Sequence, residues 1–247
     1  MSTCVSPTRK TPTELLSLFG LALGLLGSAA SEVSASCAED VARRVQAHYD
    51  SVRDFKAEFE QTTRSVLFGG AGDGLSAPLR GEVVFAKPGK MRWTYTEPES
   101  SLVVSDGQLL WIYSPERKEA QRLPVPEGYL TGAALQFLLG DGKLLESFKV
   151  TSEACPLTPR LDESSDAVPL ETIDLALEPL QPSAYERLGL TARLATGEII
   201  ATRVVDLFGN ETVIAFDKIE YNRDPAPGTF HFVPDDDVAV IELQESP

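Results

Sequence analysis

Histidine and cysteine are scarce in this chain, since its 247 residues include only two His and three Cys. So few imidazole and thiolate groups leave little from which to build a zinc site, and we expect no metal. Basic side chains are also in the minority: 22 Lys and Arg stand against 37 Asp and Glu, which gives a net charge of −15. A field of that sign repels phosphate backbones, so we expect no nucleic-acid partner.

Enzyme motifs are lacking as well. The patterns G-x-S-x-G, H-E-x-x-H and C-x-x-C do not occur, and only His48 and His231 could act as imidazole bases. His48 lies beside Val45 on an amphipathic stretch, which is typical of a partly buried helix residue. An exported hydrolase using Ser105 and Asp106 is the enzymatic alternative, but an Asp-Gly pair between two apolar runs is typical of a hairpin turn. We therefore predict that the protein is not an enzyme.

The N-terminal residues differ from the rest of the chain. A basic pair precedes an apolar run from Leu15 to Leu26, which is too short to span a bilayer, and small residues follow it. This pattern is typical of a secretory signal peptide. Cleavage is expected after Ala35, with Ala30 as a second candidate and an uncut N-terminal anchor as the other interpretation. We therefore predict a signal peptide over residues 1–35 and a single exported domain over residues 36–247.

Removal of the leader changes the cysteine count. Cys4 is lost with it, and the mature chain keeps Cys37 and Cys155, an even number in an oxidising compartment. A disulfide between these two residues is one interpretation. A lipid anchor on Cys37 is the other, although the preceding Ser34-Ala35-Ser36 lacks an aliphatic residue. The sequence leaves both interpretations open.

Hydrophobic periodicity predicts one helix followed by a succession of strands. Val41, Val45, Tyr49 and Val52 recur at helical spacing and indicate an amphipathic helix of about four turns. After it, apolar and polar residues alternate with a period of two. Strands are expected in segments 55–60, 79–87, 91–95, 102–105, 108–113, 120–123, 147–151, 171–177, 188–194, 199–206 and 211–221, with a closing strand at Phe230 and Phe232.

Three further features complete the expected organisation. Asp106-Gly107 predicts a two-residue hairpin turn in which both residues have positive φ. Residues 133–139 are almost wholly apolar and indicate a short covered helix, and residues 155–169 indicate a long exposed loop. Because no βαβ alternation occurs, we predict a mainly β (α+β) fold, with about eleven strands in an antiparallel sheet curled over helices.

A broad sheet with so little helix to cover it would leave an apolar interior that its own side chains do not fill, and such interiors hold apolar ligands. For any one residue, a place in an ordinary hydrophobic core is the competing interpretation. The candidate ligand-binding residues are Phe55, Phe59, Val83, Phe85, Met91, Trp93, Tyr95, Trp111, Phe137 and Leu138.

Several motifs in order resemble the periplasmic lipoprotein carrier family, LolA. The chain carries KPGKMRWTYTEP from Lys87, then LVVSDG from Leu102 and LWIYSP from Leu110. FKAEFEQ from Phe55 resembles the family's first strand, and FHFVP from Phe230 resembles its closing motif. The resemblance extends from about Val41 to Val238.

This resemblance implies an incomplete antiparallel β-barrel lidded by helices and enclosing an apolar cavity. The cavity would take the acyl chains of lipoproteins from an inner-membrane ABC-type lipoprotein-releasing transporter and pass them to an outer-membrane lipoprotein receptor. It further implies a periplasmic protein that needs no cofactor, and we expect it to be a monomer. A carrier of another exported lipid, such as a glycolipid or pigment, and a lipid-anchored outer-membrane receptor of the same fold are the alternatives.

One position departs from the family pattern. An Arg in the family precedes the Pro of the first motif and latches the lid to helix carbonyls, but Lys87 stands there in this chain. Lysine keeps the charge and loses the planar five-donor group, so we expect a weaker or displaced latch. By the same resemblance, Met91, Trp93 and Tyr95 line the cavity mouth.

Overall fold

The computed structural model describes residues 28–66, 74–125, 143–155 and 171–243. Helix α1 (Ser28–Asp50) opens the described chain, and the expected cleavage point after Ala35 lies inside it. From Cys37 onward, where side chains are described, one face of α1 is buried as its periodicity predicted. The buried residues of α1 are Ala38, Val41, Ala42, Val45 and Tyr49.

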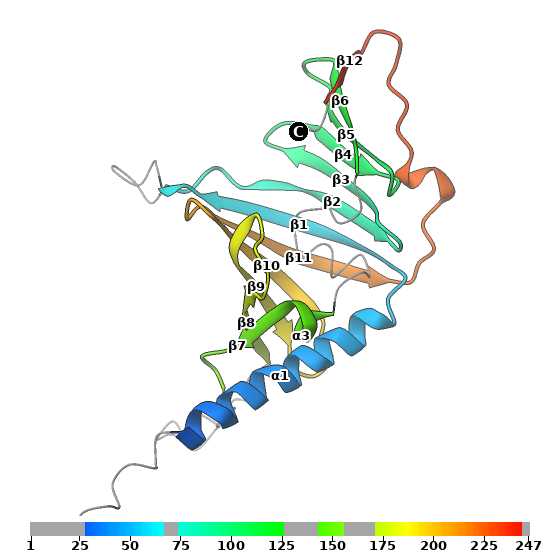
Figure 1. The fold of residues 1–247 in the computed structure, drawn as a ribbon. Helices are drawn as coiled ribbons and strands as arrows, with labels where there is room; N and C mark the ends of the chain where they lie inside the picture. The colour runs from blue at the N-terminus through cyan, green and yellow to red at the C-terminus, as the bar shows by residue number, and fades with distance from the viewer. Residues whose placement is uncertain (1–27, 67–73, 126–142, 156–170, 244–247) are drawn as a thin grey trace, which may run out of the picture.

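Twelve strands among the described residues form one open sheet, and α1 runs along the end of the sheet that contains β7 (Figure 1). The sheet order is β12-β6-β5-β4-β3-β2-β1-β11-β10-β9-β8-β7, so it does not close into a barrel. The predicted fold class is confirmed, with twelve strands where about eleven were expected. The elements are β1 (Asp54–Arg64), β2 (Leu79–Ala86), β3 (Lys90–Glu97), β4 (Ser101–Ser105), β5 (Leu109–Ser114), β6 (Glu119–Pro124), α3 (Leu144–Ser147), β7 (Phe148–Thr151), β8 (Thr172–Pro179), β9 (Tyr185–Arg193), β10 (Ile199–Asp206), β11 (Glu211–Tyr221), the 3-10 helix η2 (Pro227–Phe230) and β12 (Ala239–Glu242).

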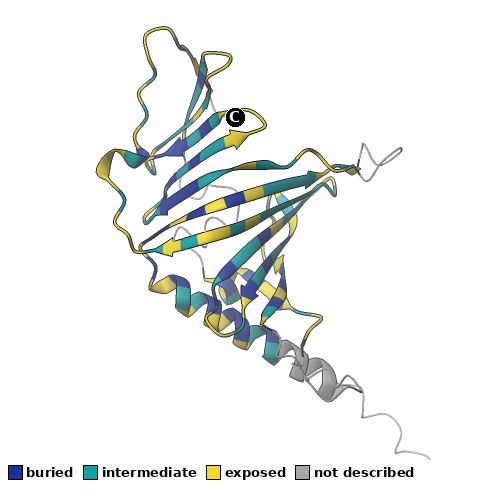
Figure 2. Ribbon diagram, turned by 180° about the vertical axis from the view of Figure 1, so that it is seen from behind, coloured by how far each residue is buried: buried dark blue, intermediate teal, exposed yellow. Residues whose placement is uncertain are grey.

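The two faces of the sheet are defined by what covers them. We call the face that packs against α1 the inner face; it carries Phe55 and Phe85, which are register partners on β1 and β2. The opposite, outer face carries charged residues along β1, where Lys56 and Glu58 alternate with the apolar residues. This alternation of buried and exposed residues is visible along the central strands in Figure 2. One-sided burial of this kind is what a half-covered antiparallel sheet requires.

The predicted hairpin between β4 and β5 is present, but its turn differs from the expected one. Ser105 is paired with Leu110, and only Gly107 has a positive φ, of 97°. The carboxylate of Asp106 accepts the backbone N–H groups of Gln108 and Leu109 at 2.8 and 2.9 Å. A longer turn therefore replaces the predicted two-residue turn. It is stabilised by the Asp106 carboxylate, which accepts the two backbone N–H groups that lack carbonyl partners on the opposite strand.

The expected closing strand at Phe230 and Phe232 is wrong. Phe230 ends the 3-10 helix η2, and Phe232 packs its ring on the outer face against Trp111 and Tyr113, at centroid distances of 5.4 and 5.1 Å. The last strand is instead β12, which pairs with β6 in parallel orientation, as Figure 1 shows. We call residues 223–238 the C-terminal strap, because they cross the outer face and deliver the chain to this sheet edge. A second, smaller apolar cluster lies beneath the strap and contains Val84, Leu102, Val104, Ala120 and Phe230.

Two predicted segments lie outside the described residues: the apolar helix over 133–139, and most of the loop over 155–169. The signal peptide lies mostly outside them as well.

Candidate functional site

Five aromatic side chains form a continuous cluster on the inner face of β1, β2 and β3. Strand pairing dictates this arrangement, because Phe85 is the partner of both Phe55 and Met91, and Val83 is the partner of Trp93. The Phe55 and Phe85 rings lie 4.8 Å apart, and Phe85 lies 5.6 Å from Trp93. Phe59 makes edge contacts with Trp93 at 4.8 Å and with Tyr95 at 5.1 Å. The structure thus brings together seven predicted residues: Phe55, Phe59, Val83, Phe85, Met91, Trp93 and Tyr95.

The structure separates Trp111 from this cluster. Trp93 pairs with Val103, which pairs with Ile112, so the neighbouring Trp111 points to the outer face. There Trp111 contacts Phe232, and the Arg122 guanidinium lies 5.3 Å from the centre of its ring. Its assignment to the ligand-binding face is therefore corrected. Phe137 and Leu138 lie outside the described residues.

Two aromatic residues of β11 join the cluster although the sequence analysis did not include them. Phe216 and Tyr221 lie 6.3 and 6.2 Å from Phe55. They differ by an odd number of positions, so simple alternation would send them to opposite faces. A register shift in the β1–β11 pairing, next to the positive φ of Lys218, restores Tyr221 to the inner face. Such a bulge leaves no clear mark in the sequence, and the paired apolar residues Ile214 and Phe216 were the available signal.

One polar contact borders the aromatic cluster. The Tyr95 hydroxyl donates to Oε1 of Gln61 on β1 at 3.4 Å. Burial raises the pKa of Tyr95 above its ordinary value. Its phenol stays neutral at physiological pH, so the aromatic cluster carries no charge of its own.

Lys87 lies at the end of β2, where the resemblance placed a latch. Its ammonium donates to the backbone carbonyl of Tyr49, in the last turn of α1, at 2.6 Å. Cations are favoured at a helix C-terminus, where carbonyl groups lack intrahelical partners. Lys87 therefore joins the aromatic strands to the helix that crosses the inner face.

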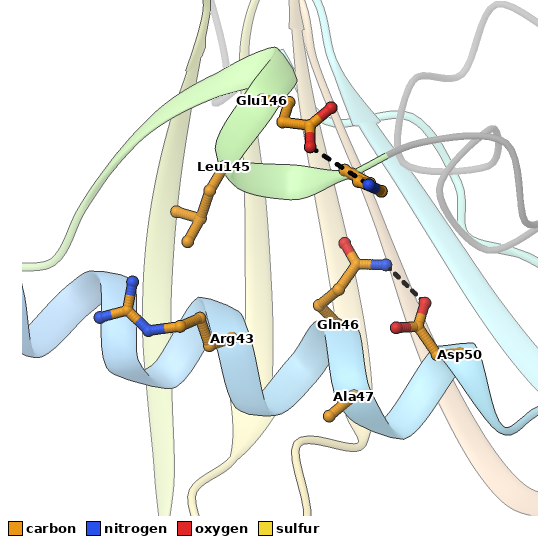
Figure 3. Close-up of a pocket in the computed structure, with 7 residues that line it drawn as sticks. Arg43, Gln46, Ala47, Asp50, Leu145 and Glu146 are labelled. Atoms are coloured by element: carbon orange, nitrogen blue, oxygen red, sulfur yellow. Dashed lines mark hydrogen bonds and ion pairs between the residues drawn. The ribbon is translucent and has the colours of Figure 1, made fainter.

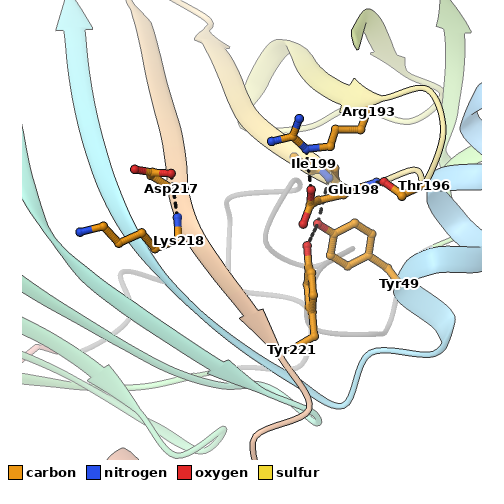
Figure 4. Close-up of polar contacts among 8 residues, drawn as sticks. All are labelled: Tyr49, Arg193, Thr196, Glu198, Ile199, Asp217, Lys218 and Tyr221. Atoms are coloured by element: carbon orange, nitrogen blue, oxygen red, sulfur yellow. Dashed lines mark hydrogen bonds and ion pairs between the residues drawn. The ribbon is translucent and has the colours of Figure 1, made fainter. Parts of the chain in front are cut away.

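Several other contacts hold α1 in place. Cys37 forms a disulfide with Cys155, with Cα atoms 5.8 Å apart. The Tyr49 hydroxyl accepts the backbone N–H of Ile199 at 3.2 Å and lies 3.5 Å from the hydroxyl of Tyr221 (Figure 4). Burial raises the pKa of Tyr49 to about 12. The helix is thus fixed at Cys37, near its middle, and at Tyr49, in its last turn.

His48 is a partly buried helix residue, as predicted, and not a placed base. Its ring packs edge-on against Tyr49 and Tyr221, each at 5.0 Å between centroids. Burial lowers the pKa of His48 below its ordinary value. The neutral ring therefore serves as packing at the end of α1.

Two hollows open beside α1, away from the aromatic cluster. One, of about 370 Å³, lies between α1 and α3 and is lined mostly by polar side chains such as Gln46, Asp50 and Glu146 (Figure 3). The other, of about 550 Å³, lies between α1 and β7. The predicted ligand-binding residues line neither of them.

In the described ranges, no set of three or more His, Cys, Asp or Glu residues is grouped as metal ligands would be. In the same ranges, helices fall short of the length and apolarity needed to traverse a bilayer.

An open, mainly β sheet, with a helix packed at its β7 end and an aromatic cluster on the inner face of β1, β2 and β3, defines the structural class. The sequence profile of one family, described as outer membrane lipoprotein carrier protein LolA, matches residues 50–233. The chain belongs to this family.

Individual relatives carry the same description. The outer-membrane lipoprotein carrier protein of Nitrosomonas europaea is 30% identical over 191 residues, which cover 76% of this chain and 82% of that protein. The one from Chromobacterium violaceum is 26% identical over 214 residues, covering 86% and 92%. Among solved structures, a LolA superfamily protein from Nitrosomonas europaea has a TM-score of 0.41 and 13% identity, covering 79% of this chain and 97% of that one. The family assignment rests on the sequence match.

Proposed function

We propose that this protein is a periplasmic carrier that shields the acyl chains of lipoproteins on its aromatic inner face. It receives them from an inner-membrane ABC-type lipoprotein-releasing transporter and delivers them to an outer-membrane lipoprotein receptor. Family membership and the names of the relatives support a lipoprotein carrier. The observation that carries the proposal is the gathering of five aromatic side chains on the inner face of β1, β2 and β3, next to the C-terminal end of α1. Catalysis is no part of this function.

Energetics set a limit on how the acyl chains are held. Three chains of about 16 carbons, at ~0.8 kcal/mol per buried CH₂, would yield on the order of 35 kcal/mol on full burial. Real affinities saturate near roughly 18 to 21 kcal/mol, so full and unopposed burial would prevent release. The carrier therefore shields the chains only in part, and the work of opening the inner face opposes binding.

Lys87 has a role in this opening. Acyl chains that enter between α1 and the aromatic strands must displace the end of the helix, which Lys87 holds through the Tyr49 carbonyl. Replacing Lys87 by Leu removes that contact and alters loading or transfer. Loading and transfer that both stay normal in Lys87→Leu would disprove this role.

The two alternatives differ in what the protein carries and where it is anchored. A carrier of a glycolipid or pigment would use the same apolar face, so the face alone does not select the cargo. An anchored receptor would need acyl chains on Cys37, whose sulfur is bonded to Cys155 in this structure. Native mass spectrometry of protein purified from its host without detergent separates the three: a triacylated polypeptide adduct supports the lipoprotein carrier, a free lipid adduct supports the alternative cargo, and an acylated Cys37 supports the receptor.

The two tryptophans provide a sharper test, because they lie on opposite faces. A synthetic triacylated lipopeptide with brominated acyl chains quenches tryptophan only at close contact. In Trp111→Phe, which keeps Trp93, we expect saturable quenching of the emission. In the matched variant Trp93→Phe, which keeps Trp111, we expect little change. Equal quenching of both variants, or none in either folded variant, would contradict binding on the inner face.

A further inference from the structure

Large apolar side chains project into solvent at one end of the sheet. Leu207 and Phe208, in the turn between β10 and β11, are 63% and 82% exposed, and Val66, just beyond β1, is 54% exposed. The two segments lie side by side, because the Val66 backbone N–H donates to Oδ1 of Asn210 at 3.2 Å. We call Val66, Leu207 and Phe208 the apolar tip. Folding leaves these three side chains uncovered, although exposing an apolar side chain to water costs free energy.

The turn that carries the tip is rigidly built. One carboxylate oxygen of Asp206 accepts the backbone N–H groups of Phe208 and Asn210, both at 2.8 Å, and the other accepts the Asn210 side-chain amide at 2.8 Å. Gly209 completes the turn with a φ of 84°. These hydrogen bonds hold the Asp206 pKa below its ordinary value. These hydrogen bonds fix the backbone of the turn, so Leu207 and Phe208 are held in their exposed positions.

An uncharged track connects the aromatic cluster to the tip along the inner face. From Phe59 outward on β1, the inner-face residues are Gln61 and Thr63. Their register partners on β11 are Ile214 and Thr212, and the next partners on β10 are Thr202 and Val204. The intervening charged residues, such as Glu60, alternate to the outer face. Strands β1, β11 and β10 are neighbours in the sheet, so these register pairs lie next to one another and lead from the aromatic cluster toward the tip (Figure 1).

Charge is balanced around the tip. Arg64 faces Glu211 across the β1–β11 pair, and the Arg203 guanidinium lies 3.0 Å from the Glu211 carboxylate. With Asp206, these make two positive and two negative charges among the described residues of β1, β10, β11 and the β10–β11 turn next to the tip, whereas the whole chain carries −15. The tip is a locally neutral apolar site on an acidic protein.

We propose that the apolar tip inserts into the surface of a zwitterionic phospholipid bilayer, and that the uncharged track joins this contact to the aromatic cluster. The proposal rests on the proposed function, because it assigns the contact that holds the carrier at the membrane surface where its transporter and receptor lie. A net neutral tip is not repelled by a zwitterionic surface, while the acidic remainder of the chain is repelled by anionic lipid. A fluid bilayer surface accommodates a small wedge without a matching pocket.

The size of the tip argues against a second copy of the chain as its occupant. Three side chains expose on the order of 300 Å², well short of the ~800 Å² per partner that a stable interface between proteins buries. Contact through this tip alone would not hold a dimer together.

Vesicle flotation tests the proposal. Wild-type protein is mixed with phosphatidylcholine vesicles, and the bound fraction is compared with that of Leu207→Ser/Phe208→Ser. Val233→Ser/Val240→Ser is the matched control, since these apolar residues are 69% and 44% exposed elsewhere on the chain. We expect the tip variant to lose at least tenfold in partitioning and the control to match wild type. Adding phosphatidylglycerol to the vesicles weakens wild-type binding at low salt.

Three results would overturn the proposal: no flotation of wild-type protein, flotation of the tip variant equal to wild type, or an equal loss in the control. A second variant, Phe208→Trp, gives a direct readout, since lipids brominated near the headgroup should quench it, and Val233→Trp should be unaffected. The lipopeptide quenching of Trp93 separates this inference from the proposed function. If Trp93 is quenched normally and the tip variant still floats, only the membrane contact is disproved; if lipopeptide leaves Trp93 unquenched, the carrier function itself fails.

Discussion

The two halves of the sheet bury different kinds of side chain on the same inner face. In the half formed by β7 to β10, the buried residues are almost all aliphatic, and they pack beneath α1 and α3. We call this the aliphatic half. In the half formed by β1 to β6, the same face carries the aromatic cluster, and toward the sheet edge Ile112 on β5 is 38% exposed. We call this the aromatic half.

This difference in side-chain type suggests that the aliphatic half contributes mainly to stability and the aromatic half mainly to ligand binding. Branched aliphatic side chains interlock densely, so the aliphatic half anchors the helix and gains most from close packing. Each aromatic ring offers a large, rigid apolar area. Such rings suit a surface that a ligand covers when it binds and exposes when it leaves. Changes in the aliphatic half should therefore act on the free energy of unfolding, and changes in the aromatic half on ligand binding.

The largest effect is expected from a cavity in the aliphatic half. Leu175→Ala, at a position that is 1% exposed, should lower the free energy of unfolding by about 2–5 kcal/mol. Leu180→Ala, at a position that is 53% exposed, is the control and should stay within about 0.5 kcal/mol of wild type. Urea unfolding followed by circular dichroism measures both. A fall in the lipopeptide affinity of folded Leu175→Ala would show that the aliphatic half also determines ligand binding, against the expectation.

The disulfide should have the next largest effect. It cross-links residues 118 positions apart, and Cys37→Ser/Cys155→Ser should cost about 2–4 kcal/mol of stability. A reductant should bring the wild type down to the level of the double variant and leave that variant unchanged. Because Cys155 follows β7, the loss falls in the aliphatic half, and the quenching of Trp93 by lipopeptide should be retained. A reductant effect on the double variant would show that the cross-link is not its target.

Alkaline pH should loosen the contact between α1 and the sheet. The pKa of Tyr49 is raised to about 12, so the native state keeps the phenolic proton that the unfolded chain loses near pH 10. Stability is fully present below pH 10 and declines by roughly 2–3 kcal/mol as pH rises toward 12. Unfolding midpoints measured from pH 8 to 12 test this. Tyr49→Phe should reduce the decline without abolishing it, because burial also raises the pKa of the neighbouring Tyr221. A wild-type profile that is level up to pH 12 would contradict it.

The smallest effect on stability is expected at Lys87, which connects the aromatic half to α1. Lys87→Leu removes a charged hydrogen bond to α1 and should cost about 1–2 kcal/mol, while Lys87→Arg should retain most of it. Hydrogen exchange should speed up in the last turn of α1 and stay unchanged in β8 and β9. Exchange that speeds up equally in β8 would mean that the halves do not open separately.

Most of the fold could be predicted from the sequence, because alternation with period two is local. The strand at 211–221 has the predicted bounds, and the buried face of α1 follows from helical spacing. The strap could not be predicted, since Phe230 and Phe232 alternate as a strand would, and only tertiary contact with the outer face decides otherwise.

For the site, alternation correctly grouped residues within β1, β2 and β3. It could not relate one strand to the next, because a register shift of one residue inverts the faces. Trp111 was misplaced for this reason. Tyr221 was missed because the bulge at Lys218 changes the count within a single strand.

The sheet order also has a consequence for how the chain folds. Strand β1 is made first, yet it is paired on one side with β11, which lies roughly 150 residues later in the sequence, as the pairing of Thr63 with Thr212 shows. Because the chain is synthesised from its N-terminus, the β1–β11 pairing cannot form until nearly the whole chain has been made. High contact order of this kind slows folding, and it leaves one edge of β1 without its β11 partner until the last part of the chain is present.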